Sequence, residues 1–193
     1  MLSFEKKIPE NFCMSSSVQL RLLAVFAFIR FWFALAQRSA FHADEFWQGP
    51  EVAYRLVFGS TETTWEWYDT VALRSHLHPL MFAAFYKLVA LASLDYPDVI
   101  AHGPRVLQGL LNAFGDVAFY LLVKKLYGSK VAAYGVTSYI TTWYSIFTLS
   151  RTTSNSAEAV LTLLGLYFLF VRNSPVYTAS AAADRLCECG HQC

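Results

Sequence analysis

Long runs of apolar residues alternate with short polar segments along this chain of 193 residues. Because an α-helix needs about 20 mainly apolar residues to cross a bilayer, runs of this length predict membrane spans rather than strands, which would show alternation with period two. The pattern therefore predicts an all-α integral membrane protein built as a multi-span helical bundle, with spans at residues 18–36, 106–125, 131–150 and 157–172.

A further apolar segment, residues 77–94, has Lys87 near its middle and Pro79 near its start. Both features favour a helix that lies in the membrane interface, although a full crossing is the alternative. The interfacial arrangement also puts the lysines between the second and third spans in the cytosol, which agrees with the positive-inside rule. In that arrangement the polar turn 151–158 emerges on the same side as a loop of interfacial helices at 37–104.

The two ends of the chain differ in character from its body. Residues 1–17 are polar and basic, which predicts a cytosolic N-terminus. The run 18–36 ends in small residues like a signal-peptide cleavage site, but Arg30 interrupts its apolar core, so we favour a retained span. Arg30 and Asp116 lie inside predicted spans. Arg30 is expected to face a polar cavity or a partner, and Asp116 the bundle interior. Residues 173–193 are rich in cysteine and predict an atypical tail.

Charge and composition exclude several classes of partner. Charged residues make up 15% of the chain, against roughly 25% in soluble domains, and the net charge is +1. No basic stripe with interleaved aromatic residues occurs, so a nucleic-acid partner is not expected. The cysteines and histidine of the tail are spaced more tightly than zinc ligands, and the histidines near residue 78 lack ligand spacing. We therefore expect no metal and no cofactor.

The polar segment 42–79 is the strongest candidate for chemistry. Asp44 and Glu45 follow the first predicted span directly. A carboxylate held beside apolar surface can act as a general base, because partial desolvation raises its pKa. The alternative is that Asp44 is the cap or a first-turn acid of a helix over 45–58.

Other polar and aromatic residues are candidates for substrate binding, each with a plainer alternative. The indoles of Trp65 and Trp67 can stack on a sugar or sit in the interfacial belt. Cationic side chains before Pro79, and Arg105, can hold a lipid phosphate or contact ordinary headgroups. The turn near Asn155 can supply polar contacts to a substrate. The alternative is a capping box, in which Ser154 or Asn155 caps the next helix and Glu158 is the acidic partner. The candidates are Trp65, Glu66, Trp67, Arg74, His78, Arg105, Arg151, Asn155 and Glu158.

Four motifs carry a family resemblance. They are H-x-D-E-F-W-Q at 42–48, T-W-E-W at 64–67, L-R-S-x-x-H-P at 73–79 and R-T-x-S-N-x-x-E at 151–158. Together they resemble the dolichyl-phosphate-mannose-dependent mannosyltransferases of the endoplasmic reticulum, glycosyltransferase family 22. The resemblance implies a GT-C fold in the endoplasmic reticulum membrane, with several spans and a luminal active site.

The order of the motifs most resembles the members that extend the glycosylphosphatidylinositol (GPI) precursor. This resemblance implies transfer of the third mannose, in α1,2 linkage and with inversion, from dolichyl-phosphate mannose to the GPI precursor in the lipid bilayer. Asp44 would be the base, and Glu45 and Glu158 would orient sugar hydroxyls with support from Arg151 and Asn155. The departing phosphate would be stabilised by Arg74, His78 or Arg105. An α1,2-mannosyltransferase of the N-glycan precursor is the alternative within the family.

Two departures from the family pattern lead to a second hypothesis. Ala43 stands where the family often has proline, and the resemblance ends near residue 172 although family members are longer. A truncated chain is therefore expected, and an inactive membrane protein that binds dolichyl lipid or partner subunits is the non-enzymatic alternative.

Overall fold

The structure, a computed structural model, describes residues 16–40, 42–59, 62–68, 70–71 and 73–172, and no β-strand occurs in these ranges. The described elements are helical. They are α1 (Ser16–Ala36), α2 (Asp44–Trp47), α3 (Pro50–Phe58), the 3₁₀ turn η1 (Trp65–Trp67), α4 (Leu77–Leu91), α5 (Pro97–Tyr127), α6 (Ser129–Thr141), α7 (Trp143–Phe147), α8 (Ser154–Tyr167) and the π-helical turn η2 (Phe168–Arg172). The prediction of an all-α chain is confirmed for the described residues.

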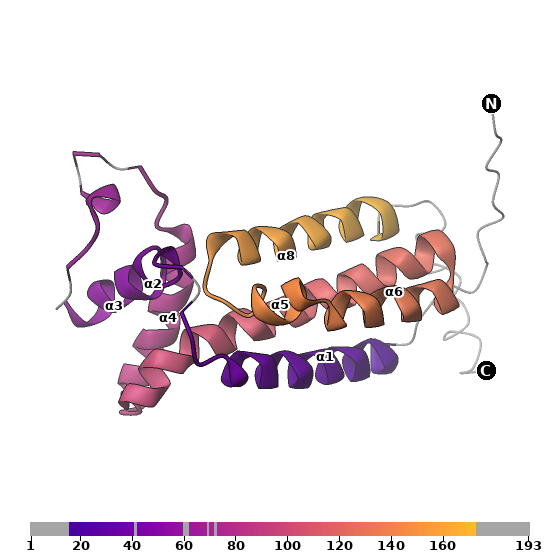
Figure 1. Ribbon diagram of the computed structural model, residues 1–193, viewed down its shortest axis with the longest axis horizontal. Coiled ribbons are helices and arrows are strands. Elements are labelled where there is room, and N and C mark those ends of the chain that lie inside the picture. Colours follow the sequence, from indigo (N-terminus) through magenta and orange to yellow (C-terminus); the bar gives the residue numbers. More distant parts are fainter. Residues whose placement is uncertain (1–15, 41, 60–61, 69, 72, 173–193) are drawn as a thin grey trace, which may run out of the picture.

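Helix α5 is the central element of a helical bundle. It packs against α1, α6 and α8, and Figure 1 shows these helices extending along the long axis of the molecule. An apolar cluster joins Phe26 of α1, Ala113 of α5 and Ile140 of α6. A Cβ atom at Gly109 would lie 3.1 Å from the Arg30 carbonyl oxygen, so glycine permits the close approach of α1 and α5. Small residues at such contacts are typical of helices packed in membranes.

A second apolar cluster lies at the other end of the molecule, where α2, α3 and α4 gather (Figure 1). Ala53 of α3 packs there with Phe82 and Tyr86 of α4. Local sequence sets the ends of α3: Pro50 begins the helix, where its missing N–H costs nothing. Gly59 ends it with a φ of 79°, a left-handed conformation that glycine adopts without strain.

Two described helices, α1 and α5, are long and apolar enough to cross a membrane. Helix α5 has 31 residues. At a rise of 1.5 Å per residue it is about 46 Å long, well beyond the roughly 30 Å of a hydrocarbon layer. One end of α5 can therefore extend past the apolar layer, and that end packs against α4. Helix α4, with 15 residues, and α8 are shorter apolar helices.

The polar residues predicted to face the bundle interior do so. The Arg30 guanidinium of α1 donates to both carboxylate oxygens of Asp116 on α5, at 2.8 Å each. It also donates to the carbonyl and hydroxyl oxygens of Ser145 on α7, at 2.7 and 2.9 Å. Because Arg30 and Asp116 are both buried, their charges are paired inside the bundle as membrane burial requires.

Two segments predicted as single helices are each divided. Residues 131–150 form α6 and α7, separated at Thr142, which has an extended backbone. The hydroxyls of Thr141 and Thr142 bond carbonyl oxygens one turn earlier, a pattern that weakens and bends helices. Residues 45–58 form α2 and α3, separated at Gln48 and Gly49. A Cβ at Gly49 would lie 3.1 Å from the Phe82 ring and 3.3 Å from the Thr152 carbonyl oxygen, so this junction is in close contact with α4 and with the turn before α8.

Candidate functional site

A groove of about 1040 Å³ opens between α4, α5, α8 and the loop before α4. Its polar end contains side chains from that loop, from the start of α4 and from the start of α8, and its apolar end follows α5 and α8. The polar lining residues are Gln48, Trp67, Arg74, Ser75, His78, Ser154, Glu158 and Thr162, and the apolar ones are Leu73, Leu77, Pro79, Met81, Leu111, Phe114, Ala157, Val160, Leu161 and Leu164. The groove is thus suited to a molecule with a polar head and an apolar chain.

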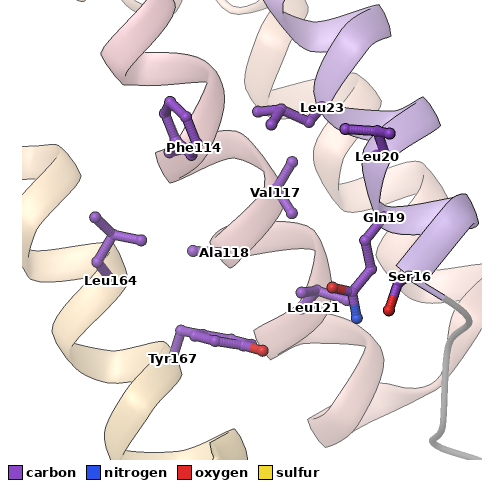
Figure 2. Close-up of a pocket in the computed structure, with 10 residues that line it drawn as sticks. All are labelled: Ser16, Gln19, Leu20, Leu23, Phe114, Val117, Ala118, Leu121, Leu164 and Tyr167. Carbon is purple, nitrogen blue, oxygen red and sulfur yellow. The ribbon is translucent and has the colours of Figure 1, made fainter.

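The apolar end of the groove meets a second cavity of about 340 Å³. Figure 2 shows this cavity between α1, α5 and α8, with Phe114 and Leu164 on its wall. Both residues also line the groove, so the two spaces share a wall. From Leu111 in the groove to Leu121 in the cavity, α5 advances about 15 Å. Apolar surface therefore continues along α5 for a distance that several isoprene units could cover.

The polar end of the groove is organised around Arg74. Its guanidinium donates to the Glu66 carboxylate at 2.7 and 3.3 Å, and its side chain is 34% exposed. Among the described residues that line the groove, Arg74 is the only arginine or lysine. Trp67 lies beside it in the lining, with its indole in edge contact with the His76 ring. A partly exposed cation beside a flat aromatic ring can receive an anionic head group.

Directly behind the polar end, Glu45 is completely buried and joins two arginines. Its two carboxylate oxygens accept from Arg105 at 3.0 Å and from Arg151 at 2.6 Å. Both arginines also donate to the Ser39 carbonyl oxygen, and the Glu45 carbonyl oxygen accepts from the Thr152 hydroxyl at 2.7 Å. This network ties α2 to α5 and to the turn before α8. The predicted convergence of the two polar regions on one side is therefore confirmed.

Asp44, the neighbour of Glu45, is in a different environment. Its side chain is half exposed, and one carboxylate oxygen lies 3.5 Å from the His42 ring. The backbone N–H of Gln48, the C-cap of α2, donates to the Asp44 carbonyl oxygen across one helical turn, so the two residues lie on the same face. Asp44 does not itself line the groove, but it lies one helical turn before Gln48, which does, and its carboxylate is accessible.

His78 and Gln108 form a neutral polar pair between α4 and α5. Burial lowers the pKa of the His78 imidazole, and the Gln108 amide partly opposes this shift. The two side chains nevertheless do not reach hydrogen-bonding geometry, and no nitrogen of the ring and neither polar atom of the amide has a partner. His78 is therefore expected to be uncharged at neutral pH.

Gln108 and Asn112 are not among the predicted site residues, although their spacing in the sequence carries a signal. Gln108, Asn112 and Asp116 recur every four residues in a predicted span, and all three are buried on one face of α5. Polar residues at helical spacing within an apolar run indicate a face turned toward a polar interior.

The residues predicted for the site divide into three groups. Trp67, Arg74, His78 and Glu158 line the groove. Glu45, Arg105 and Arg151 are buried behind it in one ionic network, and Glu66 pairs with Arg74. Trp65 and Asn155, which are exposed, and Asp44, whose side chain is half exposed, do not line the groove. No group of three metal-ligating side chains occurs in the described part of the chain, and the cysteines of the tail lie outside it.

Of the two roles predicted for Asp44 at its helix, first-turn acid is confirmed and cap is not, and the caps predicted for α8 are wrong. The cap position of α2 is Ala43, with Asp44 in the first turn, and no side chain caps that helix. Helix α8 begins at Ser154 after Thr153, whose hydroxyl meets that of Ser156 at 2.9 Å. Because the turn before α8 is docked on Glu45, the tertiary contacts decide where this helix begins.

Comparison with known proteins supplies the family. The profile of the Alg9-like mannosyltransferase family matches residues 21–185. This chain belongs to the Alg9-like mannosyltransferase family. The match covers the described site and all four motifs, and it extends past residue 172, near which the resemblance was expected to end.

Among relatives of this Alg9-like chain, Mannosyltransferase APTG1 of Arabidopsis thaliana is 42% identical over 135 residues, 70% of this chain and 24% of the relative. The human GPI alpha-1,2-mannosyltransferase 3 is 37% identical over 131 residues, 68% of this chain and 23% of the relative. The GPI mannosyltransferase 3 of Schizosaccharomyces pombe is 39% identical over 147 residues, which are 76% of this chain and 28% of the relative. The chain thus spans about a quarter of the length of these curated relatives. No solved structure matches it at a significant level.

Proposed function

We propose that this chain carries the donor groove and the catalytic aspartate of a GPI mannosyltransferase, which adds the third mannose in α1,2 linkage from dolichyl-phosphate mannose. The observation that carries the proposal is the groove itself. Its polar end contains residues of the family motifs, and its apolar end continues along α5. Relatives named as GPI mannosyltransferases support the acceptor class.

In the proposed reaction Asp44 is the general base. Its carboxylate takes the proton of an acceptor mannose hydroxyl, and the oxygen attacks C1 of the donor mannose from the face opposite the phosphate. The C1–phosphate oxygen bond breaks, dolichyl phosphate leaves with the bonding electrons, and the β donor becomes an α product. The transition state resembles an oxocarbenium ion, as in other glycosyl transfers.

Charge in the groove favours Arg74 for the leaving group. Donors aimed at developing negative charge stabilise a departing phosphate. Arg74 keeps an exposed fraction while paired with Glu66, so it can turn toward a phosphate. Arg105 and Arg151 are instead occupied by Glu45, and we propose that they hold α2 in place and thereby position Asp44. Glu158, at the start of α8, faces the groove and is suited to bind a sugar hydroxyl.

The proposed location is the endoplasmic reticulum membrane, with the active site luminal. Helices α1 and α5 are the candidate spans, and α4 lies at the polar end beside α3, in keeping with an interfacial helix. No step of this mechanism requires a cofactor.

The decisive experiment is complementation in cells that lack GPI mannosyltransferase 3. We expect the chain to restore surface GPI-anchored protein and to deplete the accumulated dimannosyl precursor. Asp44→Asn should abolish rescue at equal abundance, because the amide cannot accept the proton. Asp95→Asn changes an exposed acid outside the groove and should rescue like the unchanged chain.

Each outcome separates the hypotheses. Rescue by Asp44→Asn would refute the base. Failure of the unchanged chain, with retained binding of dolichyl phosphate, would favour the non-enzymatic lipid-binding alternative. If the chain instead rescued a strain defective in mannosylation of the N-glycan precursor, the acceptor would be that precursor and not the GPI precursor.

A further inference from the structure

Two buried amide side chains and one half-buried histidine beside the groove have hydrogen-bonding capacity that the protein does not use. Gln108 is fully buried, and neither its amide oxygen nor its amide nitrogen has a partner. The Asn112 side-chain oxygen and both ring nitrogens of His78 also lack partners, while the Asn112 nitrogen donates to the Leu149 carbonyl oxygen. Because an unpaired buried polar group is costly, such a cluster calls for an explanation.

This cluster adjoins the polar end of the groove. His78 lines the groove, and the Gln108 amide is close enough to influence the ring. Gln108 and Asn112 lie one turn apart on α5, and Leu111, between them in sequence, also lines the groove. A ligand that displaces the side chains at this end by a small amount would meet all three groups.

The chemistry of the cluster favours a neutral ligand rich in hydroxyl groups. The side-chain amides of Gln108 and Asn112 each have N–H donors and an oxygen acceptor. A hydroxyl group can accept a hydrogen bond from the donors and donate one to the acceptor. The charged residues on the same stretch of α5 are already neutralised: Arg105 pairs with Glu45, and Asp116 with Arg30. An anion would instead be attracted to Arg74 in the open part of the groove.

We propose that Gln108 and Asn112, together with His78, form the subsite that binds the hydroxyl groups of the donor mannose. This proposal rests on the proposed function. The donor sugar is favoured over the acceptor sugar because a single phosphate joins it to its apolar chain. The cluster likewise lies directly beside the apolar lining formed by Leu111 and Phe114. An acceptor that already carries two mannoses has its terminal sugar several units away from its lipid.

Binding measurements on the complete chain in lipid nanodiscs test this subsite. The first probe is a short isoprenyl phosphate that carries β-mannose, and the second is the same isoprenyl phosphate without the sugar. Gln108→Met is the informative variant, because it retains the side-chain shape and breaks no hydrogen bond of the protein. We expect about a ten- to hundredfold weaker affinity for the mannosyl probe and an unchanged affinity for the bare phosphate.

Leu110→Met, an exposed position on the same helix, is the matched control and should bind both probes normally. If Gln108 is only structural, or only binds trapped water, the variant should bind the mannosyl probe as the unchanged chain does, which would overturn the subsite. Equal weakening for both probes would also overturn it. If the unchanged chain binds neither probe, both this proposal and the proposed function fail.

A second measurement varies the ligand. A series of mannosyl probes, each lacking one hydroxyl, should bind the unchanged chain more weakly at the hydroxyls that meet the amides. Gln108→Met should lose part of that discrimination. Equal affinity of the unchanged chain for every member of the series would contradict a hydroxyl-binding subsite.

Discussion

At the scale of single residues, the neighbours Asp44 and Glu45 illustrate how environment separates two identical functional groups. The Asp44 side chain is half exposed, one helical turn before the groove residue Gln48, whereas that of Glu45 is fully buried between Arg105 and Arg151. The same charge is therefore available for proton transfer at one position and committed to an ionic network at the next. We expect substitutions at the two positions to have different effects, on turnover at Asp44 and on stability at Glu45.

Glu45→Ala should destabilise the fold strongly. It leaves the Arg105 and Arg151 charges buried without their carboxylate, and breaking a buried ion pair from one side costs about 3–5 kcal/mol. In detergent, the unfolding temperature of Glu45→Ala should be much lower than that of the unchanged chain. The unfolding temperature of Glu62→Ala, at an exposed position of the loop, should change little. Equal stability of the two variants would refute the structural role of Glu45.

The buried imidazole of His78 should make stability depend on pH. Burial places its folded-state pKa below the usual 6.5, so the unfolded chain binds the proton more readily. The stability that the neutral His78 ring contributes is therefore fully present above its pKa in the unfolded chain. That stability is lost as the pH falls toward its pKa in the folded protein. Between about pH 7.5 and about pH 5.5, unfolding temperature should fall less in His78→Gln than in the unchanged chain. His42→Gln, at an exposed histidine, is the control, and identical pH profiles for all three would contradict the argument.

At the scale of elements, the bundle is joined by polar contacts as well as by apolar packing. Arg30 of α1 bonds Asp116 of α5 and Ser145 of α7, three helices that are far apart in sequence. Because apolar side chains gain little by leaving lipid for another apolar helix, close packing and polar contacts have to specify the arrangement. The Arg30–Asp116 pair provides such a contact, and Gly109 lets α1 approach α5 closely.

A double substitution tests this contact. Arg30→Leu should lower stability by about 3–5 kcal/mol, because Asp116 stays buried without its partner. Arg30→Leu with Asp116→Leu should recover most of that loss, since no lone charge remains. Unfolding of the single and double variants in detergent provides the comparison. Additive losses in the double variant would indicate that the two residues do not act as a pair.

At the scale of the whole molecule, polarity changes along the long axis. The loops around the groove, the ionic network of Glu45 and helices α2 to α4 occupy one end, and the bundle of long helices extends from it (Figure 1). The contact between Glu45 and Arg151 requires the two polar regions to lie on the same side of any membrane that α1 and α5 cross. In the proposed orientation this side is the lumen of the endoplasmic reticulum.

Glycosylation mapping tests that orientation. The natural chain has no N-x-S/T acceptor, and Glu62→Asn creates one before Thr63 and Thr64 in the loop. In microsomes we expect this variant to gain a glycan that an endoglycosidase removes. The added change Thr64→Ala destroys the acceptor and should abolish the shift. An unmodified Glu62→Asn chain in an otherwise competent reaction would place the loop in the cytosol.

Sequence alone was sufficient for the features that depend on local pattern. Apolar runs predicted the helices around α1, α5 and α8, and the charges of Arg30 and Asp116 inside such runs predicted buried partners, because charge in an apolar layer has to be paired. Several residues of the family motifs line the groove, and positive charge between spans predicted that the two polar regions share one side.

Tertiary structure was needed wherever a contact joins distant segments. It decided that Glu45 is buried and Asp44 accessible, and that Gln108 and Asn112 adjoin the groove. It also divided the predicted helix 45–58 between α2 and α3 at Gln48 and Gly49, where close packing against Phe82 and Thr152 requires a residue without a side chain. The physical reason is that burial, ion pairing and steric contact depend on which segments meet in space, whereas helix propensity and apolar periodicity depend on neighbours in the chain.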